Sequence, residues 1–444
     1  MRHAENLATG RGLVFNPGDK LLVISNPLYV FLLTGLRLLG FNIPAASNGI
    51  GILSIAATAA IVHRMFAARD LPWWGVAAAF LLLIFPHSYR ALGSDRPLYT
   101  TLVMASFLAY CLGRRLVVPW LWGAVTLTRF DGFLVALTTV ASDTWKRRAL
   151  PFREALIYGA ILLALIAFNF AYFQAPFRQD LGVQHLGAEL TGATFLKGAY
   201  RWVVTYTAQS VFNWLYVVLP LMGLAYILVV DRGWLPLVLW AASYVALYVA
   251  LGLPGAHWYY VPLVPVIIIL AVLGLRWSAH LLGRLLALNA ERARTAVAAV
   301  SLIALLLGTG ALVSLYILRG ETWESSRFSV YKQAAEWLAN NASPNATVGL
   351  QEVGIMGFYS GLHVVDFNGQ MTPEVAAANP KSQTEAALWA VQRFRPDFVA
   401  IIPSWLPKLV ESDAFRTSYV PVARFTDPQF IYGEVVVYKR AGTP

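Results

Sequence analysis

Two side chains of opposite charge lie within a largely apolar stretch of the sequence, residues 116–145. Arg129 and Asp131 are separated there by a single residue, and basic clusters lie at both ends of the stretch. A charge near the centre of a bilayer costs on the order of 2.5 to 3.5 kcal/mol on insertion scales, so it is retained for a reason. Two hypotheses account for it: the side chains form an ion pair that stabilises a turn, or they line a polar cavity.

A second acidic candidate, Asp95, lies in a short connection between two apolar segments. An aspartate shortly before a proline, here Pro97, is typical of a helix N-cap, and that structural role is one interpretation. In the other interpretation the carboxylate belongs to an active site, because Asp95 is predicted to lie on the same side of the membrane as Arg129.

The other candidates are donors in two further connections. His257, Trp258 and Tyr259 follow one another in the first. An interfacial aromatic belt explains Trp and Tyr at such a position, whereas a histidine adds a titratable donor suited to a phosphate oxygen. The second connection, 174–202, carries basic residues that either bind a lipid phosphate or are solvated at the surface. These are Arg178, His185, Lys197 and Arg201.

Composition restricts the class of protein. Of the 444 residues 58% are hydrophobic and only 13% are charged, and the mean hydropathy is +0.59, which predicts a polytopic membrane protein. The net charge is +11, but Lys and Arg lie mostly in short loops, as orientation signals do, so nucleic acid is not an expected partner. The single cysteine excludes an intrachain disulfide, and no metal-ligand or nucleotide-binding motif is present.

Apolar segments that approach the length of a membrane span recur over residues 41–318. Segment 21–40 carries polar residues and is predicted to lie along the outer interface instead. Segment 116–145 is positive at both ends, so we expect a hairpin of two short arms whose ends are cytoplasmic and whose apex lies below the outer surface. The predicted spans lie near 45–66, 72–86, 98–113, 154–175, 206–230, 234–252, 258–275 and 296–318.

The composition changes near residue 319 to a mixed polar pattern. The predicted topology places residues 319–444 outside the cytoplasm. Helices and buried strands alternate in this part, which predicts a small α/β domain with a largely parallel sheet. Helices are expected at 331–340 and 384–394, and strands at 346–350, 363–367, 398–402 and 435–438.

Four motifs resemble those of bacterial membrane glycosyltransferases of the GT-C superfamily, especially the arabinofuranosyl- and mannosyltransferases. Residues 4–18 resemble the first-loop pattern A-x-N-L-x-x-G-x-G-L-V-F-N-P-G, and residues 127–132 resemble L-T-R-P-D-G with Phe130 in place of the proline. The loop around Asp95 resembles S-G-x-E-T-P-L-Y, and the element at residues 253–262 resembles the G-x-x-x-W-Y-Y-x-P stretch. The resemblance implies a GT-C-like polytopic α-helical membrane protein with a small C-terminal extracytoplasmic α/β domain.

The resemblance also implies a function. The chain would transfer a sugar from a polyprenyl-phosphate donor to a glycan, lipid or protein acceptor of the cell envelope, with inversion, at the outer face of a bacterial cytoplasmic membrane. No cofactor or metal is implied. The rival hypothesis is a non-catalytic transporter or flippase of a lipid-linked sugar, or a glycan-binding membrane scaffold.

The roles implied for individual residues follow the same motifs. The principal base, an acidic residue of the first loop, is expected upstream of Met1, so that residues 1–20 are the remainder of that loop. Asp95 and Asp131 are the candidate catalytic carboxylates within the sequence. The candidate substrate-binding residues are Arg2, Asn6, Asn16, Arg129, Arg201, His257, Trp258 and Tyr259.

Overall fold

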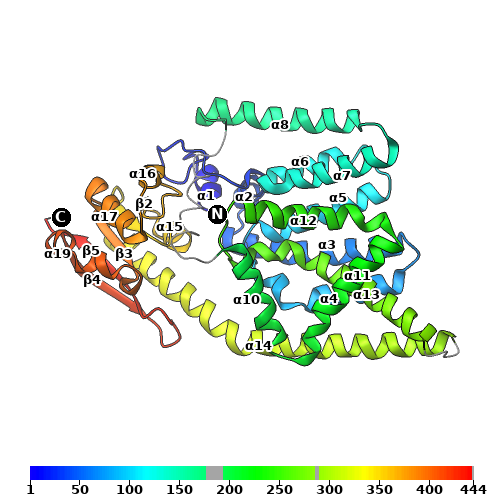
Figure 1. The fold of residues 1–444 in the computed structure, drawn as a ribbon. Helices are drawn as coiled ribbons and strands as arrows, with labels where there is room; N and C mark the ends of the chain where they lie inside the picture. Colours follow the sequence, from blue (N-terminus) through cyan, green and yellow to red (C-terminus); the bar gives the residue numbers. More distant parts are fainter. Residues whose placement is uncertain (177–193, 286–289, 443–444) are drawn as a thin grey trace.

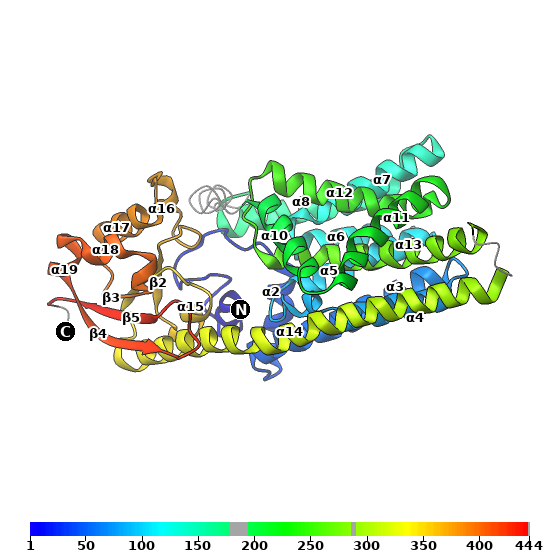
Figure 2. The same ribbon diagram turned by 60° about the horizontal axis from the view of Figure 1, so that its bottom comes forward.

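A computed structural model describes residues 1–176, 194–285 and 290–442 of the protein. A bundle of helices carries a small sheet-containing domain at one end, and the N-terminus lies between the two (Figure 1). A single long helix, α14, runs along the bundle and continues into the C-terminal domain (Figure 2).

The helices of the bundle are built from apolar residues, and several begin with proline in the first turn, where its missing N–H costs nothing. Among the described residues, five helical segments are long and apolar enough to cross a membrane, and the chain is a multi-pass membrane protein. The principal helices are α3 (Ile43–Ala67), α4 (Pro72–Ile84), α5 (Arg96–Cys111), α6 (Val118–Thr128), α7 (Phe133–Arg147), α8 (Phe152–Phe173), α10 (Phe195–Thr207), α11 (Leu215–Val229), α12 (Leu235–Ala250), α13 (Val264–Leu285) and α14 (Ala290–Asn341).

The predicted hairpin over residues 116–145 is confirmed as two helices, α6 and α7, joined by the short 3-10 turn η2 (Phe130–Gly132). Gly132 is required in this turn, because a Cβ there would lie 2.6 Å from the carbonyl carbon of Val125 in α6. The close approach of turn and helix fixes the direction in which the two charged residues of the apex point.

One predicted span is interrupted. Residues 206–230 do not form one helix, because α10 ends at Thr207 and α11 starts at Leu215, after the 3-10 turn η3 (Val211–Trp214). Ser210 caps that turn by accepting a hydrogen bond from the backbone N–H of Phe212 at 3.2 Å. The polar residues just before the turn therefore end α10, which apolar content alone did not indicate.

The C-terminal domain holds a five-stranded sheet with the order β2-β1-β3-β5-β4. The predicted largely parallel sheet is only half correct, since β2, β1 and β3 are parallel whereas β3, β5 and β4 are antiparallel. The omitted strand β4 lies at the edge and contains Pro421, so it lacks the buried apolar run of the others. The strands are β1 (Thr347–Leu350), β2 (His363–Asp366), β3 (Phe398–Ile401), β4 (Tyr419–Thr426) and β5 (Glu434–Arg440).

The helix predicted at 331–340 is the last part of α14, which is a single helix of 52 residues. The helix predicted at 384–394 is α17 (Gln383–Phe394). Residues Val330, Tyr331, Ala334 and Leu338 of α14 pack against the sheet. The helix therefore attaches the C-terminal domain directly to the bundle.

The N-terminal segment forms helix α1 (Arg2–Ala8) and an irregular loop that binds the edge of the sheet. Asn16 hydrogen-bonds Val364 of strand β2 twice, accepting from its N–H at 2.9 Å and donating to its carbonyl oxygen at 2.9 Å. Arg2 donates to the carbonyl oxygens of Gly357 and Leu362. Asn6 donates to the carbonyl oxygens of two loop residues, Val14 and Phe15, each at 2.9 Å. The loop therefore behaves as an additional edge segment of the sheet.

After the loop, helix α2 (Pro27–Leu38) packs against α1. Arg37 of α2 and Glu5 of α1 form an ion pair with an N–O distance of 2.9 Å. The apolar faces of both helices share a cluster that includes Ala4, Tyr29 and Leu33. The loop that binds the sheet is thus anchored to the bundle as well.

We predict that Asn16→Ala lowers the stability of the contact between the N-terminal loop and the C-terminal domain. The substitution leaves the buried N–H and carbonyl of Val364 unpaired, at a cost of about 1–3 kcal/mol. Thermal unfolding of the detergent-purified protein should show a lower midpoint, and limited proteolysis should cut the loop faster. Asn340→Ala, at an exposed position of α14, is the matched control. An unchanged midpoint for Asn16→Ala would contradict the assignment.

Candidate functional site at the hairpin apex

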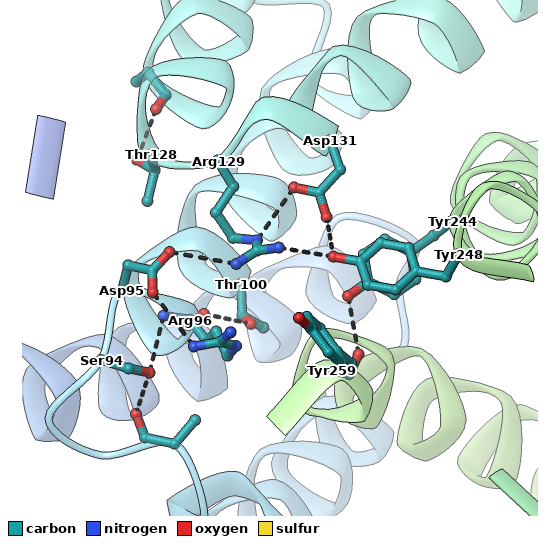
Figure 3. Close-up of polar contacts among 12 residues, drawn as sticks. Ser94, Asp95, Arg96, Thr100, Thr128, Arg129, Asp131, Tyr244, Tyr248 and Tyr259 are labelled. Carbon is teal, nitrogen blue, oxygen red and sulfur yellow. Dashed lines mark hydrogen bonds and ion pairs between the residues drawn. The ribbon is translucent and has the colours of Figure 1, made fainter. Parts of the chain in front are cut away.

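The guanidinium of Arg129 is the centre of a buried polar cluster at the hairpin apex (Figure 3). Its Nε donates to Asp131 Oδ1 at 3.1 Å, and its Nη2 donates to the hydroxyl of Tyr248 in α12 at 2.7 Å. The Tyr248 hydroxyl in turn donates to Asp131 Oδ2 at 2.6 Å. Both carboxylate oxygens of Asp131 are therefore occupied, and the residue is only 2% exposed.

Asp95 joins the same cluster from the start of α5. Its Oδ2 lies 3.5 Å from Nη1 of Arg129, and its Oδ1 lies 3.5 Å from Nη1 of Arg96. Asp95 does occupy the N-cap position of α5, but its side chain makes no capping hydrogen bond. The geometry therefore favours the ion-pairing role over the N-cap role that the sequence left open.

Arg96 is a site residue that the sequence analysis missed. Its guanidinium carbon lies 5.7 Å from the ring centroid of Trp258 and 5.4 Å from that of Tyr259, distances typical of cation–π contacts. Its Nε is buried and has no hydrogen-bond partner. Because an unpaired buried donor on a cation is costly, this nitrogen marks a position suited to an anionic ligand.

A wall of tyrosines closes the cluster on the side of α12. Tyr244 and Tyr248 stack with ring centroids 4.2 Å apart, and the Tyr244 hydroxyl donates to the carbonyl oxygen of Tyr259 at 2.9 Å. The ring of Tyr99 lies 5.6 Å from the guanidinium carbon of Arg129. The spacing of four residues between Tyr244 and Tyr248 was the one signal in the sequence that placed both hydroxyls on the same helix face.

The structure brings together five of the predicted site residues, namely Asp95, Arg129, Asp131, Trp258 and Tyr259. His257 lies next to them at the start of the 3-10 helix η5 (His257–Leu263). Its carbonyl oxygen is hydrogen-bonded to Nε2 of His87 at 2.9 Å, and its ring lies beside that of Trp258.

The other predicted residues lie elsewhere. Arg2, Asn6 and Asn16 are engaged at the N-terminal loop and the edge of the sheet, as described above. Arg201 is exposed on α10. Arg178 and His185 lie outside the described residues. Within the described residues, no group of three or more His, Cys, Asp and Glu side chains is arranged to hold a metal ion.

The charges of the cluster alternate along a chain: Asp131, Arg129, Asp95 and Arg96. Two cations and two carboxylates balance, so their burial does not leave a net charge in the interior. Arg129 lies at the centre of this chain and contacts both carboxylates. An anion bound at Arg96 would add a negative charge at the end of the chain where the cation has an unused donor.

A long apolar groove adjoins the apex on the other side of the hairpin. It has a volume of about 690 Å³ and lies between α6, α7, α8 and the segment that precedes α2. Phe130, which is 52% exposed, lines the groove, whereas its neighbours Arg129 and Asp131 point into the polar cluster. At the hairpin apex, adjacent residues therefore face different surroundings: Phe130 faces the apolar groove, and Arg129 and Asp131 face the charged cluster.

A second set of acidic residues lies where β1 and β2 end. The carboxylate of Asp366 accepts hydrogen bonds from the backbone N–H groups of Asn368 and Met371, at 2.8 and 2.9 Å, which closes a turn. Burial raises the pKa of Asp366 to about 6. Burial also raises the pKa of Glu352, against the opposing effect of the Arg327 guanidinium. The hydrogen bonds of Asp366 indicate a structural role.

The fold and the site together define a multi-pass membrane protein with a charged site at one end of its helix bundle. Known proteins share parts of this architecture. Residues 318–439 match the profile of a domain of unknown function, DUF8728. ArnT from Cupriavidus metallidurans bound to undecaprenyl phosphate superposes with a TM-score of 0.59 at 17% identity, over 100% of this chain and 93% of ArnT. A search of the curated proteins finds no match.

The archaeal oligosaccharyltransferase AglB from Archaeoglobus fulgidus, in complex with an inhibitory peptide and a dolichol-phosphate, is also similar. Its TM-score is 0.55 at 13% identity, over 100% of this chain and 69% of that chain. The present chain therefore has the fold of ArnT and AglB, in agreement with the predicted GT-C-like fold class. At these identities the likeness establishes the fold.

We predict that Arg129→Ala destabilises the protein strongly, because it leaves Asp131 and one side of Asp95 buried without a cation. Removing one partner of a buried ion pair costs about 3–5 kcal/mol. The double variant Arg129→Leu with Asp131→Leu should regain most of the thermal stability, since Asp95 keeps Arg96.

Arg153→Ala, at an exposed arginine of α8, is the control for charge removal. Thermal unfolding is measured on all four proteins. A double variant as unstable as Arg129→Ala would contradict the assignment of Arg129 and Asp131 as a buried ion pair.

Proposed function

We propose that the protein is a membrane glycosyltransferase that uses a polyprenyl-phosphate-linked sugar as donor. The observation that carries this proposal is the position of the apolar groove, which ends at Phe130, next to the charged cluster of Arg129, Asp95 and Arg96. An isoprenoid tail in the groove would bring its phosphate to the apex. The likeness of the fold to ArnT bound to undecaprenyl phosphate supports this choice of ligand.

The residues of the cluster have distinct roles in this proposal. The free Nε of Arg96 would donate to a phosphate oxygen, and Trp258 and Tyr259 would hold the guanidinium in place. Phosphate is a competent leaving group, so donors that stabilise its developing charge supply most of the catalysis. Arg129 would act chiefly by fixing Asp95 and Asp131 in their positions.

The acceptor needs a carboxylate, because its hydroxyl has a high pKa and must lose a proton as it attacks. Asp95 is the carboxylate of the described cluster whose two oxygens contact only guanidinium groups, and we assign it to the acceptor side. A single displacement with the carboxylate opposite the leaving phosphate inverts the anomeric centre. His257, which lies next to the cluster, would contribute to the phosphate side, and the acceptor would be a cell-envelope glycan, lipid or protein.

The proposed reaction takes place outside the cytoplasm of a bacterial cell, at the cytoplasmic membrane. Support comes from the basic clusters at both ends of the hairpin, since Lys and Arg favour the cytoplasmic side. The hairpin apex then lies on the opposite side, together with the C-terminal domain.

A substitution in the groove tests the proposed donor. Leu162 lines the groove, whereas its neighbour Leu163 is 68% exposed on another face of α8. We expect Leu162→Trp to raise the KM for an undecaprenyl-phosphate sugar by about tenfold, equivalent to about 1.4 kcal/mol. The KM for a donor with only two isoprene units should not change, because its tail does not reach Leu162. Leu163→Trp is the matched control.

Transfer of labelled sugar and photolabelling by a benzophenone derivative of undecaprenyl phosphate are both measured. Equal effects of the two tryptophan variants would contradict the groove assignment. A wild-type protein that neither transfers sugar nor becomes photolabelled would contradict the proposed function itself.

Cysteine labelling tests the proposed orientation. Phe130 and Ser404 are both exposed, and each can be replaced by cysteine in a Cys111→Ser background. A membrane-impermeant maleimide should label both on intact cells, whereas a cysteine at Trp145, near the other end of α7, should react only after lysis. Labelling of the position 145 cysteine on intact cells, with protection at 404, would reverse the orientation.

A further inference from the structure

A second cavity lies at the end of the bundle opposite the C-terminal domain. It has a volume of about 420 Å³ and is formed where α5 and α7 end and where α6 and α8 begin. Its charged lining consists of four cations and two carboxylates: Arg69, Arg115, Lys146, Arg147, Asp143 and Glu154. None of these residues belongs to the cluster at the hairpin apex.

The carboxylates of the cavity are already neutralised. Arg115 lies 3.3 Å from Asp143 and 3.7 Å from Glu154, and Arg147 lies 2.8 Å from Asp143. Lys146 faces the ring of Tyr110 at 5.7 Å, and no ion pair with a described carboxylate includes it. Arg69 forms an ion pair with Asp231, which lies outside the lining, with an N–O distance of 3.9 Å. With that carboxylate counted, a surplus of one positive charge remains, which favours an anionic over a zwitterionic occupant.

The cavity is connected to the apolar groove through Trp122, which lines both. Its side chain is buried, and its Nε1 has no hydrogen-bond partner, which leaves a donor at the junction of the polar and apolar spaces. Ala155 and Tyr158 line the groove together with Trp122. A molecule with a charged head and an apolar tail would fit the charged cavity and the adjoining apolar groove.

Helix α8 leaves room for such a tail. Its only buried residues are Glu154 and Phe173, in its first and last turns, and only 6% of its most apolar window is buried. The helix contacts α6 through Tyr158, whose hydroxyl is hydrogen-bonded to Thr126 at 2.9 Å, and through Ile161, which packs against Gly123, and the rest of this side borders the apolar groove. In a bilayer the intervening space is filled by lipid chains.

We propose that this cavity binds the phosphodiester of an anionic glycerophospholipid from the membrane leaflet at this end of the bundle. Lys146 and the outward sides of Arg115 and Arg147 contact the phosphate, and the acyl chains enter between α8 and the α6–α7 hairpin. Basic pockets between transmembrane helices are suited to anionic head groups. The head-group site is separate from that of the isoprenoid phosphate proposed at the apex and does not depend on that proposal, although both tails would lie between α8 and the hairpin.

Native mass spectrometry of the detergent-purified protein tests the site. The protein is incubated with equal amounts of phosphatidylglycerol and phosphatidylcholine that carry the same acyl chains. We expect the wild-type protein to retain phosphatidylglycerol at least fivefold over phosphatidylcholine, and Lys146→Gln to lose this preference. Lys146 is exposed, so the variant should fold, and its unfolding midpoint is measured as well.

Arg153→Gln is the matched control, because Arg153 is an exposed cation of α8 outside the cavity lining. It should keep the preference, and photolabelling by polyprenyl phosphate should be unchanged in both variants. Equal retention of the two phospholipids, or an equal loss in Arg153→Gln, would overturn the proposal. Displacement of phosphatidylglycerol by millimolar inorganic phosphate would show a free-anion site and would overturn it too.

Discussion

The charge of Arg129 is the constraint on which the architecture around the apex depends. A guanidinium cannot be buried without partners, and its partners come from three places in the chain: Asp131 within the turn η2, Asp95 at the start of α5, and Tyr248 in α12. Because each partner must present its oxygen to one planar group, these elements are fixed relative to one another. The alternation of two cations and two carboxylates then makes the burial tolerable.

Features of the site and the fold could be predicted from the sequence where neighbouring residues mark them, and not where they depend on residues far apart in the chain. The hairpin was predictable, because two charges interrupt an apolar stretch that is basic at both ends. The partnership of Tyr248 with Asp131 was not predictable, since the two residues lie 117 positions apart and Tyr248 belongs to a predominantly apolar helix. The role of Arg96 was equally hidden, because its aromatic partners belong to a distant segment. In the C-terminal domain the buried strands were predictable, whereas the edge strand β4, with its exposed side chains, was not.

In the N-terminal loop, the contacts that the residues make differ from the role that their motif predicted. The motif directed attention to Arg2, Asn6 and Asn16 as ligands of a substrate, yet in the structure their polar atoms are bound to backbone groups of the loop and the sheet. Asn and Arg side chains can pair with the backbone at the edge of a sheet as well as with a substrate, so the residue type alone does not distinguish the two roles. Their role as substrate ligands remains a prediction, and their place in holding the C-terminal domain is directly visible.

The lengths of the helices connect these observations. Helix α8 has 22 residues and extends about 33 Å, enough to cross the hydrocarbon core, whereas α6 has 11 residues and extends only about 16 Å. The hairpin therefore ends well short of the level that α8 reaches, so its apex forms the floor of a recess. The N-terminal loop and the C-terminal domain lie over that end of the bundle (Figure 1). Charges in the recess are thereby kept from lipid, and a lipid that lies along α8 meets them only where the shorter helices end.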